Sequence, residues 1–146
     1  MLRNIHKILI IEDDRKRIQL FEGWMPEYYR AIFVKTAGAA LGLLERDKGR
    51  VYAGICLDHD LQQQIAVSSD RDLSGTTVVN AIIRYISSDV PVLVHSRNEK
   101  RACYMERKLV EKGFYVTKVP MDQLVKEKFL LWLEEVGQIW SESQED

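Results

Sequence analysis

Five short runs rich in isoleucine and valine recur along this 146-residue chain, each followed by a segment with helical character. Most residues of each run are apolar, and the runs do not alternate regularly between apolar and polar residues. That pattern is typical of parallel strands covered by helices on both faces, so the chain predicts an α/β fold. The predicted strands span residues 7–11, 31–36, 52–57, 90–95 and 114–119.

The segments between these strands carry residues that start or end helices. Pro26 ends the first helical pattern, and Gly49 and Gly113 suit the left-handed conformation that closes the second and the fourth. Ser74 can cap the third at its N-terminus. The polar stretch 62–72 has no clear period and is predicted to be a loop. The predicted helices span residues 15–25, 37–49, 75–87, 99–112 and 121–140.

These elements predict one domain over residues 1–140, with 141–146 as a frayed tail. We expect a flavodoxin-like, doubly wound parallel sheet in the order 2-1-3-4-5, with helices on both faces. In such sheets ligands bind beyond the carboxyl ends of the strands, where the strand order reverses. That point lies between the first and third strands, so the acidic residues 12–14 and 58–60 should meet there.

Carboxylates gathered at one site repel each other unless a cation neutralises them. Mg²⁺, or another divalent cation such as Mn²⁺, suits the site because it prefers hard oxygen ligands and commonly binds phosphates. The predicted metal ligands are Glu12, Asp13, Asp58 and Asp60, with Asp14 as a further choice. A carboxylate beside the metal can also attack phosphorus and carry the phosphoryl group.

Phosphoryl transfer further requires a hydroxyl to hold a phosphoryl oxygen and a cation to neutralise charge. Ser96 ends the fourth predicted strand, and Lys118 lies near the end of the fifth. Both should therefore lie on the same rim as Asp58. Arg15 could hold phosphate oxygens with its planar guanidinium.

Two histidines, His59 and His95, follow the third strand and end the fourth. An imidazole acts as a general acid or base near neutral pH. Such a pair could activate water and protonate a leaving alkoxide, two steps that a phosphodiester or cyclic phosphate needs and a simple phosphoacceptor does not. Asp60 could orient one of these rings.

This set of residues resembles the receiver domain of bacterial two-component response regulators, over nearly the whole chain. The resemblance places Glu12 and Asp13 in the acidic pair, Asp58 at the phosphoacceptor position, and Ser96 at the switch hydroxyl. Lys118 matches the receiver lysine, although the proline that normally follows it directly comes one position late, in "KVP". The resemblance implies magnesium binding and a phosphodonor or signalling protein as partner.

Several motifs depart from those of a typical receiver and resemble those of a divergent branch, the cyclic-phosphate processing receiver domain. They lie in "IEDDR" (11–15), "LDHDL" (57–61), "SG" (74–75) and "VHSRN" (94–98). Arg15 fits the first motif of that branch, with glutamate in place of its first aspartate. This resemblance implies a small phosphate ester as an alternative partner.

Each candidate residue also has an ordinary role that the sequence leaves open. The triplet 12–14 could cap the first helix, because acids favour helix N-termini, and Ser96 could cap the fourth. His95 could be a core histidine, His59 could point into solvent, and Lys118 could be a surface lysine.

Three functions therefore compete. The first is a receiver phosphorylated on Asp58, the second a metal-dependent phosphoesterase that uses His59 and His95, and the third a pseudo-receiver that binds partners without chemistry. The receiver is the leading interpretation, and whether the chain is an enzyme stays open.

Composition excludes some partners. The formal net charge of −1 argues against an electrostatic drive toward nucleic acid or anionic membranes, and the longest apolar runs are too short to span a bilayer. Cys56 and Cys103 lack metal-ligand spacing, which favours a reducing, cytoplasmic setting. The aromatic C-terminal stretch, with Phe129, Trp132 and Trp140, predicts core packing and leaves a homodimer open.

Overall fold

The computed structural model describes residues 5–58 and 75–144, and its centre is a five-stranded parallel sheet. The strand order is β2-β1-β3-β4-β5, which confirms the predicted topology. Leu9 of β1 pairs with Ile32 of β2 and with Ile55 of β3, while Leu93 of β4 pairs with Cys56. The strands are β1 (His6–Ile11), β2 (Tyr29–Val34), β3 (Gly54–Asp58), β4 (Val92–Ser96) and β5 (Val116–Pro120).

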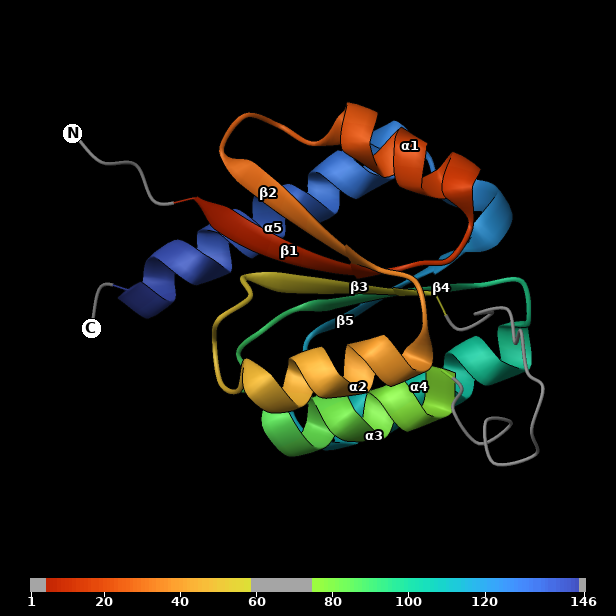
Figure 1. The fold of residues 1–146 in the computed structure, drawn as a ribbon, viewed down its shortest axis with the longest axis vertical. Coiled ribbons are helices and arrows are strands. Elements are labelled where there is room, and N and C mark those ends of the chain that lie inside the picture. The colour runs from red at the N-terminus through yellow and green to blue at the C-terminus, as the bar shows by residue number, and fades with distance from the viewer. Residues whose placement is uncertain (1–4, 59–74, 145–146) are drawn as a thin grey trace.

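Helices cover both faces of this sheet (Figure 1). On one face lie α1 and α5, and on the other lie α2, α3 and α4. The helix bounds are α1 (Arg15–Trp24), α2 (Ala37–Arg46), α3 (Gly75–Tyr85), α4 (Glu99–Glu111) and α5 (Lys126–Gln144), with a short 3-10 helix, η2 (Met121–Gln123), before α5.

Two apolar clusters form the core because successive strand side chains point to opposite faces. Ile11, Leu57 and Val94 pack against α2, α3 and α4. Cys56 and Leu93, one position earlier on β3 and β4, pack against α1 and α5. The central strands are thus buried on both faces, which is why they are hydrophobic throughout.

Local sequence explains where the helices begin and end. The Asp14 and Asn98 side chains accept hydrogen bonds from the N–H groups of Arg17 and Arg101, each at 3.1 Å, and so cap α1 and α4. Gly113 follows α4 with a φ of 90°, a conformation that glycine adopts without strain.

The C-terminal region differs most from expectation. The helix predicted from residue 121 starts as η2, and α5 begins at Lys126. It then continues through Gln144, so residues 141–144 are helical. Phe129 and Trp132 are buried against the sheet, as predicted for core aromatics.

No helix in the described ranges is long and apolar enough to cross a membrane. The N-cap predicted at Ser74 and the loop predicted over 62–72 lie outside the described residues.

Candidate functional site

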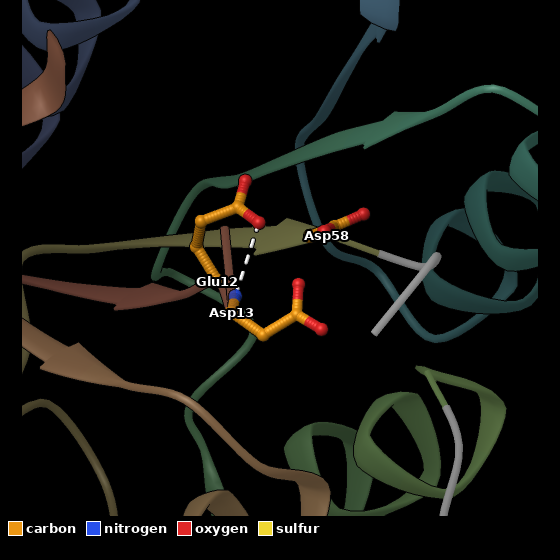
Figure 2. Close-up of side chains that lie close together, drawn as sticks. All are labelled: Glu12, Asp13 and Asp58. Atoms are coloured by element: carbon orange, nitrogen blue, oxygen red, sulfur yellow. Dashed lines mark hydrogen bonds between the residues drawn. The ribbon is translucent and has the colours of Figure 1, made fainter. Parts of the chain in front are cut away.

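Three carboxylates converge at the carboxyl ends of β1 and β3 (Figure 2). Asp58 is the last residue of β3, and Glu12 and Asp13 directly follow β1. One oxygen from each of the three lies within 4.8 Å of the others. The prediction that the first and third strands bring their acids together is therefore confirmed.

This cluster is enclosed by protein. The side chains of Glu12 and Asp58 are fully buried, and Asp13 is half-buried. Burial raises the pKa of the neighbouring Cys56 thiol well above its ordinary value, and the negative charges of Glu12 and Asp58 raise it further. Cys56 therefore stays a neutral thiol beside the acids.

Glu12 receives hydrogen bonds from the chain that follows it. Its Oε2 accepts from the backbone N–H groups of Asp13 at 3.0 Å and Asp14 at 3.1 Å. The turn from β1 into α1 therefore wraps around this carboxylate and compensates part of the cost of burying it.

Arg17 is the main counter-charge of Glu12, and the sequence reasoning missed it. Its Nε lies 2.6 Å from Glu12 Oε1, its Nη2 lies 3.3 Å from Glu12 Oε2, and the same Nη2 lies 3.6 Å from Asp58 Oδ2. Burial lowers the pKa of Arg17, but the hydrogen bond and the negative charges around it raise that pKa above its ordinary value. The available signal was a basic residue one turn into α1, three residues after its N-cap.

Arg15, the arginine predicted to hold phosphate, is exposed at the first position of α1. Asp14 acts as the helix cap, and the N–H of Arg17 lowers its pKa. Asp14 thus takes the ordinary role that the sequence left open.

His95 lies beside the cluster in the interior. It pairs with Asp58 in the register of β3 and β4, is fully buried, and places Nε2 3.7 Å from Glu12 Oε1. Its ring centroid is 6.0 Å from that of Phe21 on α1. His95 therefore faces α1, next to Glu12.

Ser96 is also buried, at the end of β4. Its Oγ accepts a hydrogen bond from the backbone N–H of Asn98 at 2.9 Å and lies 3.3 Å from the Asn98 carbonyl. The hydroxyl thus shapes the turn into α4, while Asn98 is the helix cap.

The Lys118 ammonium contacts α4. Its Nζ lies 2.6 Å from Glu99 Oε1 and 3.0 Å from Cys103 Sγ. These two contacts raise the pKa of Lys118, with the Glu99 contact dominant. In the register of β4 and β5, Lys118 pairs with Val94, whose side chain faces α2, α3 and α4, whereas Asp58 pairs with His95. Strand β4 therefore lies between Lys118 and Asp58, and Lys118 is one register position out of line with Asp58.

His59, Asp60 and Ser74 lie outside the described residues.

The donor set fits a magnesium ion. All three groups are carboxylates, the hard oxygen ligands that Mg²⁺ prefers. Oxygens on opposite sides of an octahedral magnesium are about 4 Å apart, so a spread of 4.8 Å needs only a small closure. The cluster is thus compatible with a magnesium site in which Asp58 is a phosphoacceptor.

Comparison with known families agrees with this geometry. Residues 7–111 match the family described as "Cyclic-phosphate processing Receiver domain", which covers most of the chain. No curated protein sequence is similar enough to count as a relative.

Solved structures share the fold. The signal receiver domain of an HD domain-containing protein from Pseudomonas fluorescens Pf-5 superposes with a TM-score of 0.67 at 17% identity, covering 92% of this chain and 95% of that one. The receiver domain of a sensor histidine kinase from Pseudomonas aeruginosa PAO1, which has magnesium in its active-site cleft, gives 0.64 at 18% identity, covering 91% and 98%. A two-component response regulator from Clostridium difficile gives 0.67 at 18% identity, covering 91% and 96%. At these identities the likeness shows a shared fold.

Proposed function

Because the chain belongs to the cyclic-phosphate processing receiver domain family, we propose that it is a magnesium-dependent phosphoacceptor that takes a phosphoryl group on Asp58. The observation that carries this proposal is the convergence of Glu12, Asp13 and Asp58 within 4.8 Å. Receiver domains interact with phosphodonors or signalling proteins, and we propose such a partner here. Two free thiols, Cys56 and Cys103, favour the cytoplasm as its setting.

In the proposed reaction, a carboxylate oxygen of Asp58 attacks the phosphorus of a phosphodonor. The bond from phosphorus to the donor's leaving oxygen breaks, and that oxygen departs with the electron pair. Magnesium, held by carboxylates of the cluster and by water, would supply positive charge for the transferring group. Asp13 is the most accessible of the three, since its side chain is half-buried and those of Glu12 and Asp58 are not exposed.

Ser96 and Lys118 complete the proposal as the hydroxyl and the cation that hold phosphoryl oxygens. Ser96 lies at the end of β4, next to His95, the register partner of Asp58. Lys118 can take this role only after its ammonium leaves Glu99, to which it is bonded here. Asp60 is proposed as a further ligand of the ion.

A second candidate, hydrolysis of a cyclic phosphate, is favoured by the description of the family. In this reaction His95 and His59 would exchange protons with water and with the leaving alkoxide. Burial of His95 against Glu12 and Phe21 weighs against direct contact with a substrate. Phosphoacceptance is therefore the leading function.

The test uses the full chain with Mg²⁺ and acetyl phosphate, followed by intact-protein mass spectrometry. We expect the wild type to gain one phosphoryl group, and both Asp58→Asn and removal of Mg²⁺ with EDTA to abolish the gain. Lys16→Gln, an exposed change on α1, is the control and should behave as wild type. A wild type that gains no mass but cleaves a 2′,3′-cyclic nucleotide would support the second candidate. A wild type that does neither and binds no Mg²⁺ would be a pseudo-receiver.

A further inference from the structure

The Arg17 guanidinium lies between two of the three clustered acids. Nε and Nη2 form a two-pronged contact with Glu12, at 2.6 Å and 3.3 Å. Nη2 is also 3.6 Å from Asp58 Oδ2 and 3.8 Å from Asp14 Oδ2. One guanidinium therefore joins the turn after β1 to the phosphoacceptor position at the end of β3.

Glu12 has little acceptor capacity left for a metal ion. A carboxylate offers about four lone-pair sites. In Glu12 these face two backbone N–H groups and two guanidinium nitrogens, and His95 Nε2 approaches the same oxygen as Arg17 Nε. Glu12 is thus placed to hold Arg17, and direct coordination of the ion falls to Asp13 and Asp58.

The remaining donors of Arg17 are suited to an anion. A guanidinium carries five N–H donors in a fixed plane, and Glu12 occupies only part of them. None of the described residues accepts a hydrogen bond from Nη1. The side chain is 19% exposed and lines a hollow of about 160 Å³ with Leu20, Phe21, Trp24 and Leu124. Solvent can therefore reach the guanidinium side chain.

We propose that Arg17 is a further residue that positions phosphoryl oxygens at this site, with Glu12 as its anchor. The proposal rests on the proposed function, because it places the phosphoryl group on or beside Asp58. A phosphoryl group there would lie within reach of Nη2, and a planar guanidinium binds phosphate oxygens with defined geometry. Arg15, by contrast, is exposed at the start of α1.

The experiment measures phosphorylation by acetyl phosphate at saturating Mg²⁺ for the wild type, Arg17→Gln, Arg17→Lys and the control Lys16→Gln. We expect Arg17→Gln to raise the half-saturating acetyl phosphate concentration at least tenfold. Arg17→Lys should recover part of this loss, because lysine restores charge without the fork. Lys16→Gln should change it less than twofold. The half-saturating Mg²⁺ concentration, measured by calorimetry, should stay within threefold of wild type or fall in Arg17→Gln.

Because Arg17→Gln leaves Glu12 buried without its main counter-charge, the double variant Glu12→Gln/Arg17→Gln provides a folded alternative. It should bind Mg²⁺ within threefold of the wild type and show the same increase in half-saturating acetyl phosphate. A large loss of Mg²⁺ binding in this variant would make Glu12 a direct ligand and overturn the anchor role.

Two further outcomes separate this inference from the proposed function. If the wild type is phosphorylated and Arg17→Gln matches it, or if only Arg15→Gln raises the half-saturating concentration, the role of Arg17 is wrong and the function stands. If the wild type is not phosphorylated, calorimetry with inorganic phosphate and Mg²⁺ decides. Phosphate binding that is tenfold weaker in Arg17→Gln than in the wild type would support the role of Arg17 without the phosphoacceptor function. No phosphate binding by the wild type would overturn both the role of Arg17 and the phosphoacceptor function.

Discussion

Two ion pairs at the carboxyl ends of the strands have the same shortest distance and opposite surroundings. Arg17 Nε lies 2.6 Å from Glu12, and Lys118 Nζ lies 2.6 Å from Glu99. The Glu12 side chain is fully buried, whereas that of Glu99 is 62% exposed. Distance therefore does not distinguish the two pairs, and access to water does.

The contrast shows which of the two ion pairs the folded structure depends on. Water can replace Lys118 around Glu99 at little cost, because exposed pairs are screened. Water cannot replace Arg17 around Glu12 as readily, since the surroundings are backbone, His95 and Asp58. The Arg17 pair is thus part of the fold, and the Lys118 pair is a contact that can open while the fold persists.

The largest expected effect comes from breaking the buried pair. Arg17→Gln should lower the free energy of unfolding by roughly 3 kcal/mol, because a buried carboxylate is left without its counter-charge. Glu12→Gln/Arg17→Gln should recover more than half of that loss. Urea denaturation followed by circular dichroism measures both. Equal losses in the single and double variants would contradict a charge-based explanation.

Magnesium binding should stabilise the fold through the buried acidic cluster, independently of the pair between Lys118 and Glu99. At a concentration of 100 times its Kd, Mg²⁺ should stabilise the wild type by about 2.7 kcal/mol. Thermal melts with and without Mg²⁺ should show this gain in Lys118→Gln and lose most of it in Asp13→Asn. An undiminished gain in Asp13→Asn would place the ion elsewhere.

Acid should open the exposed pair. The Lys118 contact, with a smaller contribution from Cys103, lowers the pKa of Glu99 from its ordinary value of 4.5. A lowered pKa means that the pair contributes stability above the ordinary value and loses it as pH falls through the lowered one. NMR titration of the Glu99 carboxyl carbon should show this shift in the wild type and a return toward 4.5 in Lys118→Gln. An identical titration in both proteins would show that the contact is not formed in solution.

The smallest effect is expected from removing the exposed pair altogether. Lys118→Gln and Glu99→Gln should each change the melting temperature by less than about 2 °C, because Glu99 is 62% exposed and an ion pair open to water contributes little. The measurement is a thermal melt at 0.1 M salt. A drop as large as that of Arg17→Gln would mean that the two pairs are energetically alike.

Hydrophobic patterning was sufficient to predict most of the fold. Runs that are apolar throughout require cover on both faces, and helices between them require parallel strands, so the sheet and its layers follow. The meeting of Asp13 and Asp58 follows in turn, because the ends of adjacent parallel strands share one edge. The start of α5 was harder to predict, since the residues from Met121 onward favour helix while the chain first leaves β5 through η2.

The sequence by itself determined which acids end the strands, and the strand order expected of a doubly wound sheet then determined which of them gather. Only the tertiary structure decided which cations join them. Strand side chains alternate between the two faces of the sheet, so the register between β4 and β5 decides on which face the Lys118 side chain lies. Here Lys118 lies on the face that α4 covers. Whether Arg17 or Arg15 turns inward depends likewise on how α1 docks against the sheet. Spacing along the chain does not contain that information, because it is set by packing between elements that are distant in sequence.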